Sequence, residues 1–224
     1  MEKKRGALAA ALAVASLLAP AGALAAGGHH GVDDANILSP GRCEQEDWFS
    51  RDQEHTRLLH AGFNCGVGPV ELGVAGEHAR GGDASAAAWN VEAKWATQVV
   101  DGLKIGWDLQ PVWQVNQRPR SGMTRVVGLA TWTPDPAWSV HLNLGHDFVR
   151  RGPDFGHYGV GVDWAPIDRW TFTGEGFADQ GTRFVRAGAR WALTGHLSLD
   201  FSRAQRVSGP APSNYTLGVT FGFD

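Results

Sequence analysis

Two groups of residues have types and spacings that could do chemistry. The first is the stretch GGHHGVDDAN, which carries His29, His30, Asp33 and Asp34. Imidazole nitrogens and carboxylate oxygens together suit Zn, Cu or Ni. A divalent metal site is therefore one interpretation of this stretch. A solvated polar tail is the other, because adjacent histidines are only a compositional hint.

The second group is the run GHLSLDF. His196, Ser198 and Asp200 alternate onto one face of an extended strand, so a nucleophile with a neighbouring base is conceivable. Residues two apart in a strand are spread along its axis, however, and this run lies beside a short turn. We therefore predict no catalytic residue, no enzymatic activity and no obligatory cofactor.

The start of the chain indicates export. Lys3, Lys4 and Arg5 precede an apolar stretch over residues 7–19, and small residues follow at Ala23-Leu24-Ala25. This pattern is typical of a secretory signal peptide, predicted over residues 1–25. The apolar stretch is shorter than the roughly 20 residues that a membrane-spanning helix needs. An exported, mildly acidic chain (formal net charge −3) is a poor candidate for binding nucleic acid.

The rest of the chain must position these groups. Along it, bulky apolar residues alternate with small or polar ones with a period of two. In Trp138–Arg150 the bulky apolar residues, such as Leu142 and Leu144, fall on one face, and His141 and Asn143 fall on the other. The same pattern recurs in a series of segments up to the last one, SNYTLGVTFGFD. Strands with two unlike faces explain this period, and no linker divides the chain.

The lengths of the segments and of their connections favour a membrane barrel. Segments of about 10–11 residues are what a tilted strand needs to cross a bilayer, whereas soluble strands cluster near 5–6. Short joints such as VDG and PID alternate with longer polar ones such as NQRPRSG. Trp132, Trp138, Trp164 and Trp170 adjoin the short joints, where an interfacial aromatic girdle would lie.

The two cysteines locate the first hairpin. If RCEQEDWFSR pairs antiparallel with RLLHAGFNCG, Cys43 falls opposite Cys65, Glu44 opposite Asn64 and Trp48 opposite His60. Opposed cysteines in such a pair lie close enough for a disulfide. This hairpin brings the count to about 12 strands, an even number, as in bacterial single-chain barrels.

By architecture and by its aromatic-rich final strand, the chain resembles bacterial outer-membrane β-barrel proteins. The predicted fold is an all-β, closed antiparallel barrel over residues 42–224, with short periplasmic turns and longer extracellular loops. Residues 26–41 are predicted to form a polar periplasmic segment. The resemblance implies a location in the bacterial outer membrane, with its lipids and the barrel-insertion machinery as partners. In that class the last residue is typically aromatic, whereas here Phe223 is penultimate and Asp224 is last.

The inner face would carry the function. The titratable residues predicted to line the lumen are Glu71, Glu77, Glu92, Lys94, Lys104, Asp108, His141, Asp147, Asp163, Glu175, Arg186, Arg190 and Asp200. Acids outnumber bases, which favours a channel or passive transporter for small solutes or cations. A salt-bridged, self-filled lumen is equally compatible with these residues. The alternative function is therefore a non-conducting structural protein, or a metal-binding one that uses the N-terminal His/Asp segment.

Overall fold

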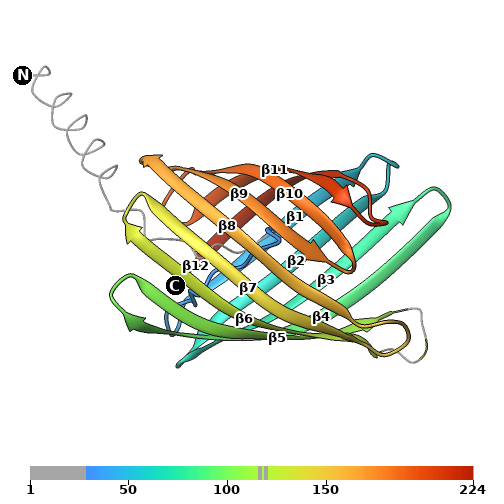
Figure 1. Cartoon of the computed structure of the whole chain (residues 1–224), viewed down its shortest axis with the longest axis horizontal. Helices are drawn as coiled ribbons and strands as arrows, with labels where there is room; N and C mark the ends of the chain where they lie inside the picture. Colours follow the sequence, from blue (N-terminus) through green and yellow to red (C-terminus); the bar gives the residue numbers. More distant parts are fainter. Residues whose placement is uncertain (1–28, 116–117, 119–120, 224) are drawn as a thin grey trace, which may run out of the picture.

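The described part of the chain forms a closed antiparallel barrel (Figure 1). The computed structural model describes residues 29–115, 118 and 121–223, so the predicted signal peptide lies outside the described residues. The strands are β1 (Cys43–Asp52), β2 (Arg57–Val67), β3 (Val70–Gly81), β4 (Ala84–Val100), β5 (Leu103–Gln114), β6 (Ser121–Asp135), β7 (Trp138–Val149), β8 (Phe155–Ile167), β9 (Trp170–Asp179), β10 (Thr182–Ala192), β11 (Leu197–Ser208) and β12 (Asn214–Phe223). Each strand pairs with its sequence neighbour, and β1 pairs with β12, so no edge remains open.

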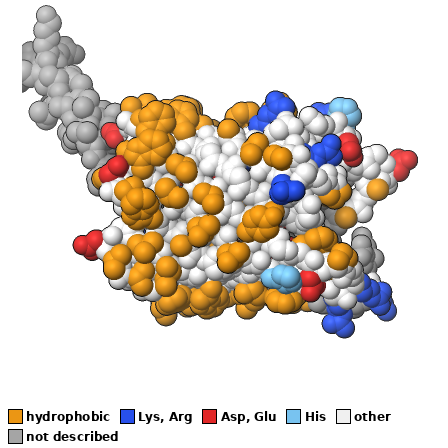
Figure 2. Space-filling view, in the orientation of Figure 1, with side chains coloured by type: hydrophobic (Ala, Val, Ile, Leu, Met, Phe, Trp, Pro, Cys, Tyr) orange, Lys and Arg blue, Asp and Glu red, His pale blue; other side chains and the backbone are white. Residues whose placement is uncertain are grey.

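The alternation of the sequence sorts side chains between the two faces of the wall. On β7, Leu142 and Leu144 are 53% and 72% exposed, whereas Asn143 and Asp147 are 1% and 0% exposed. Figure 2 shows the apolar side chains spread over the outside of the barrel. A wall with bulky apolar groups outside and polar groups inside requires lipid as its neighbour, which places this barrel in the outer membrane. The predicted fold class is confirmed.

Tryptophans cluster at the end of the barrel where the short turns lie. Trp138 and Trp164 are cross-strand partners with stacked rings, and Trp170 stacks on Trp191 of the next strand. Indole is apolar in body and polar at its N–H, so this end suits a membrane–water interface.

The difference between turns and loops is smaller than the sequence suggested. The β3–β4 and β9–β10 connections, at the end expected to carry longer loops, contain two residues each. In the latter, Gln180 and Gly181 both have positive φ (44° and 79°), which suits a tight hairpin turn. Residues expected in the longer loops belong to the strands instead. β4 has 17 residues and β6 has 15, more than a bilayer crossing needs.

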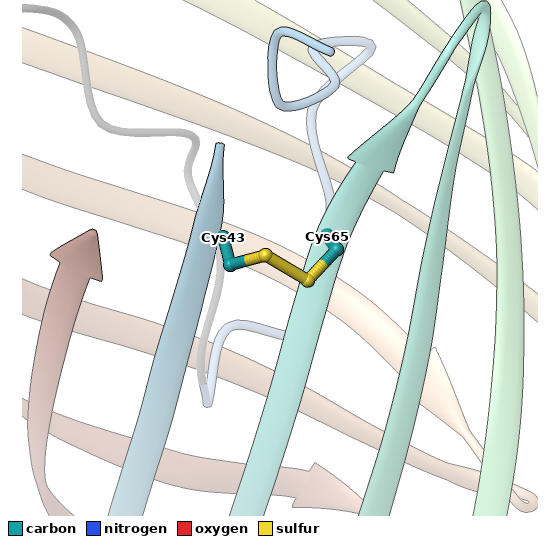
Figure 3. The surroundings of a disulfide bond; sticks show 2 residues. All are labelled: Cys43 and Cys65. Carbon is teal, nitrogen blue, oxygen red and sulfur yellow. A yellow bond between two sulfur atoms is a disulfide. The ribbon is translucent and has the colours of Figure 1, made fainter. Parts of the chain in front are cut away.

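The first hairpin has the predicted register. Cys43 faces Cys65, Glu44 faces Asn64 and Trp48 faces His60. The two cysteines form a disulfide whose Cα atoms lie 4.1 Å apart (Figure 3). Within the described ranges, no helix is long and apolar enough to cross a bilayer.

Candidate functional site: the barrel lumen and the segment that crosses it

A stretch of irregular chain runs through the inside of the barrel (Figure 1, blue). We call residues 29–38 the lumenal segment. Its backbone is hydrogen-bonded to inward side chains of five strands: β9, β10, β7, β6 and β3. The segment then leaves the lumen at Pro40, which bridges to Gly66 near the short-turn end.

One wall of the barrel holds the start of the lumenal segment. Glu175 on β9 accepts hydrogen bonds from the backbone N–H groups of Gly31 (3.2 Å) and Val32 (3.0 Å). Arg186 on β10 donates to the carbonyl oxygen of His29. Irregular backbone has no strand partner, so these side chains satisfy groups that would otherwise be buried unpaired.

Strands from β7 round to β3 hold the rest of the segment. Asn143 on β7 makes two hydrogen bonds with Asp33: its Oδ1 accepts from the backbone N–H and its Nδ2 donates to the carbonyl oxygen, both at 2.7 Å. Thr131 accepts from the N–H of Ala35 (2.8 Å), and Glu71 accepts from the N–H of Leu38 (2.7 Å). The segment is thus fixed on both sides of the lumen.

Small residues make room for this packing. Val32 lies in a buried apolar cluster with Phe177, Phe184 and Ala204. A Cβ atom at Gly31 would come within 2.6 Å of the Phe177 ring, and one at Gly159 within 2.6 Å of Val32. Glycine is therefore required at both positions for the segment to approach the wall.

This position differs from the one expected from the sequence. Residues 26–41 were predicted to form a periplasmic segment, whereas residues 29–38 lie inside the barrel. The physical reason is that the inward carboxylate, amide and hydroxyl groups of the strands offer the hydrogen bonds that its backbone needs. Residues 26–28 lie outside the described residues.

Charge pairing also holds the lumenal segment. The ammonium of Lys94 on β4, which is 3% exposed, lies 3.0 Å from Oδ2 of Asp33 and 3.5 Å from Oδ1 of Asp34. Lys104 on β5 donates to the side-chain oxygen of Asn36 at 2.6 Å. A buried ammonium without its carboxylates would be costly, so the segment and the wall depend on each other.

The four residues of the predicted metal site do not converge. His29 and His30 stack on one another with ring centroids 4.8 Å apart, whereas Asp33 and Asp34 pair with Lys94. Burial, reinforced by His30 and Arg186, lowers the pKa of His29 to about 2, so His29 is neutral. In the part of the chain that the structure describes, the side-chain groups close enough to share a metal are Asp33, Glu92 and Asp108, and Asp147, His157 and Asp179.

The three alternating residues weighed above as a nucleophile with a base, His196, Ser198 and Asp200, lie in different surroundings. Asp200 accepts a hydrogen bond from Arg190 at 2.7 Å, whereas His196 is exposed in the β10–β11 connection. Ser198 is fully buried, and its hydroxyl has no hydrogen-bond partner among the described residues.

The residues predicted to line the lumen lie on the inner face. All but one line interior cavities or contact the lumenal segment, and Asp147 pairs with Arg125, which lines the larger cavity: Glu71, Glu77, Glu92, Lys94, Lys104, Asp108, His141, Asp147, Asp163, Glu175, Arg186, Arg190 and Asp200. Several neutralise one another, with Arg190 on Asp200 (2.7 Å) and Arg186 near Glu175 (3.4 Å). Arg125, which the sequence analysis did not single out, pairs with Asp147 at 2.8 Å. Apolar and polar residues do not alternate cleanly in its strand, β6, so the sequence pattern did not indicate whether Arg125 faces the lumen or the lipid.

A cavity of about 490 Å³ lies between the lumenal segment and the wall. Its carboxylates are Asp33, Glu44, Glu46, Glu71, Glu77, Glu92, Asp108 and Asp179, and its cationic side chains are Lys94, Arg125 and Arg186. Glu44 and Glu46 were absent from the predicted lining, although the predicted first-hairpin register would have placed both on one face with Trp48.

Comparison with solved structures finds porins of the same fold. The chain is similar to the KdgM porin (TM-score 0.64, 12% identity, 81% of this chain and 99% of that one). It is also similar to the KdgM porin in complex with disordered oligogalacturonate (TM-score 0.60, 11% identity, 81% and 99%) and to the NanC porin (TM-score 0.61, 10% identity, 80% and 98%). At these identities the likeness concerns the fold. The predicted resemblance to outer-membrane barrels is confirmed.

The comparison with curated proteins found no match. One family model matches residues 13–223, which is nearly the whole chain. The chain belongs to the family described as "Uncharacterised conserved protein UCP029691".

Proposed function

We propose that this protein is an outer-membrane channel for small solutes, with a mildly acidic lumen that is narrowed by its own N-terminal segment. The observation that carries the proposal is the cavity beside the lumenal segment, in which carboxylates outnumber cationic side chains. Such a lining lowers the energy of a cation and raises that of an anion. The porin fold supports passage of solutes in general.

The acid excess argues for a solute different from the one named for the KdgM complex. Oligogalacturonate is a polyanion, and its carboxylates would meet those of Glu44, Glu46 and Glu92 in this lumen. Like charges repel strongly in a narrow space of low dielectric. We therefore propose small cations and neutral polar molecules as the solutes.

Planar-bilayer recording of the purified protein tests this proposal. We expect discrete conductance steps and a reversal potential in a salt gradient that indicates preference for K⁺ over Cl⁻. Glu44→Gln with Glu46→Gln should reduce that preference, because both carboxylates line the cavity. The matched control is Glu54→Gln in the exposed β1–β2 connection, which should leave it unchanged. Anion preference, or equal effects of both changes, would contradict the acidic-channel proposal.

A non-conducting barrel is the second candidate, and the lumenal segment itself favours it. Hydrogen bonds from backbone N–H groups of the segment to Glu175, Asn143, Thr131 and Glu71 tie it to both sides of the wall. A barrel closed in this way would give no conductance steps in the wild type. Steps that appear only after the segment is released would favour this candidate over an open channel.

A further inference from the structure

The outer face of β11, β12, β1, β2 and β3 carries an unusual row of side chains near the long-loop end. In cross-strand register, Arg203 faces Tyr215, Tyr215 faces Arg51, Arg51 faces Arg57 and Arg57 faces Arg80. We call these five residues the arginine row. All five are exposed, and the Arg203 guanidinium lies over the Tyr215 ring, 5.0 Å from its centroid.

The positive charges of Arg51, Arg57 and Arg80 in the arginine row are not balanced by nearby carboxylates among the described residues. Like charges directly opposite one another on adjacent strands are destabilising. Within the described part of the chain, no carboxylate lies within ion-pair distance of Arg51, Arg57 or Arg80, and Arg51 instead contacts His55 at 3.0 Å. Figure 2 shows Lys and Arg side chains gathered toward this end of the barrel. An external anion would relieve the repulsion.

The next register row toward the middle of the membrane is apolar on β11, β12, β1 and β2, and carries His78 on β3. Phe201, Leu217, Phe49 and Leu59 follow in the same strand order, each two residues from a member of the arginine row. Phe201, Leu217 and Leu59 are 50%, 57% and 55% exposed. The arginines therefore lie at the edge of the apolar belt. There cationic side chains destabilise a barrel little and can reach the lipid headgroups.

A groove hollows the wall directly below the arginine row. Its volume is about 770 Å³, and its lining includes Phe49, Leu59, Leu217, Ala61 and Gly76, together with the polar residues Asp47, His60, Glu77 and His78. The hollow arises because Ala61 and Gly76, cross-strand partners in the row below Leu59, replace the bulky side chains found elsewhere in the belt. It is the size of a small-molecule site and is open to the hydrocarbon.

We propose that this face binds lipid A, a phosphorylated and acylated lipid of the outer leaflet, with its phosphates on the arginine row and an acyl chain in the groove. Guanidinium groups pair bidentately with phosphate oxygens, which suits Arg51, Arg57 and Arg80. The groove lies on the same strands, one row below the arginines, so one amphipathic molecule reaches both. The apolar groove alone would also accept a second copy of the chain, but the unpaired arginines on each copy would then repel.

The test is native mass spectrometry of the full-length protein in zwitterionic detergent, titrated with lipid A. Arg51→Gln, Arg57→Gln and Arg80→Gln together should weaken binding about tenfold or more, because charged hydrogen bonds to phosphate are lost. The matched control, Arg150→Gln with Arg183→Gln and Arg206→Gln, makes the same charge change elsewhere at this end and should change binding less than twofold. An equal loss in both variants would overturn the proposal, since it would indicate attraction by net charge alone.

A groove-filling variant separates headgroup from acyl-chain binding. A Cβ at Gly76 would meet nothing within 4 Å, so Gly76→Leu should fold and still migrate as a heat-modifiable barrel. It should weaken lipid A binding several-fold. Competition by inorganic phosphate as strong as that by lipid A, or unchanged lipid A affinity in Gly76→Leu, would overturn the acyl-chain site. A protein dimer that disappears in Gly76→Leu would overturn the lipid proposal in favour of a protein interface. These outcomes do not depend on whether the barrel conducts.

Discussion

Lys94 of the barrel wall and Asp33 of the lumenal segment form an ion pair inside the barrel, with 3.0 Å between the ammonium and a carboxylate oxygen. The second carboxylate of this contact, on Asp34, lies 3.5 Å away. One buried cation thus holds two acids of a segment that has no regular secondary structure. Breaking a buried pair by removing one partner typically costs about 3–5 kcal/mol.

The first prediction follows from this pair. Lys94→Met leaves both acids without their cation, so we expect the lumenal segment to leave the lumen more often and single-channel conductance to rise. The matched control, Arg169→Gln, alters an exposed turn residue and should leave conductance unchanged. Adding Asp33→Asn and Asp34→Asn to Lys94→Met should restore the wild-type conductance in part, and absence of any coupling would contradict the role assigned to the pair.

The second prediction concerns pH. Burial lowers the pKa of His29 to about 2, below its ordinary value near 6.5, so the released segment binds a proton that the docked one does not. Docking is therefore strongest above about pH 6.5 and weakens as the pH falls below that value. We expect a thiol introduced by Val32→Cys, at a position that is 3% exposed, to react faster with a maleimide at pH 5 than at pH 7.

Two controls belong to that measurement. Rates should be normalised to Asp83→Cys, an exposed position in the β3–β4 turn, because maleimide chemistry itself depends on pH. Adding His29→Gln should remove most of the remaining pH dependence. If the reaction rate keeps its full pH dependence in that variant, the dependence comes from other groups near His29. These are His30, Arg186, Asp200 and Arg190.

The third prediction concerns the disulfide. Cys43 and Cys65 are separated by 22 residues, and closing a loop of that length stabilises a fold by about 3 kcal/mol in the chain-entropy model. Cys43→Ser with Cys65→Ser should lower the free energy of unfolding by about that amount in urea titrations of the barrel in lipid. Reducing agent should have the same effect on the wild type and none on the variant. A wild-type protein insensitive to reduction would contradict this expectation.

The fourth prediction tests which face meets lipid. Leu144 is 72% exposed on the outer face of β7, so Leu144→Arg should destabilise the barrel by about 2–4 kcal/mol if it lies near the bilayer midplane. The control Glu54→Arg, in an exposed connection, should cost far less. Equal costs in lipid would argue against a hydrocarbon neighbour for Leu144.

The sequence was most informative where the chain is regular. Period-two alternation predicted the strands and the inward position of residues such as His141 and Asp147, because each side chain of a membrane strand meets either lipid or the lumen. The two cysteines predicted the first register, since only one alignment of the flanking strands brings them face to face. The inward position of Glu44 and Glu46 follows from that same register, although the predicted lining did not include them.

The lumenal segment could not be predicted in this way. Residues 29–38 have no period, and their polar composition suits solvent as well as a polar lumen. Their position depends on contacts more than 100 residues distant in sequence, such as Asp33 with Asn143 and Val32 with Glu175. The glycines at 31 and 159 are the sequence signal for a close approach, but they become interpretable only once the two stretches are known to meet.

The path of the lumenal segment has a practical consequence for handling the protein. Because residue 29 already lies inside the wall, held by Arg186 from β10, any affinity tag or fluorescent label joined just ahead of it would start within the barrel's interior. Such a fusion would compete with the native packing around Phe177. Tags are better inserted in the β1–β2 connection around residues 53–55, which is exposed.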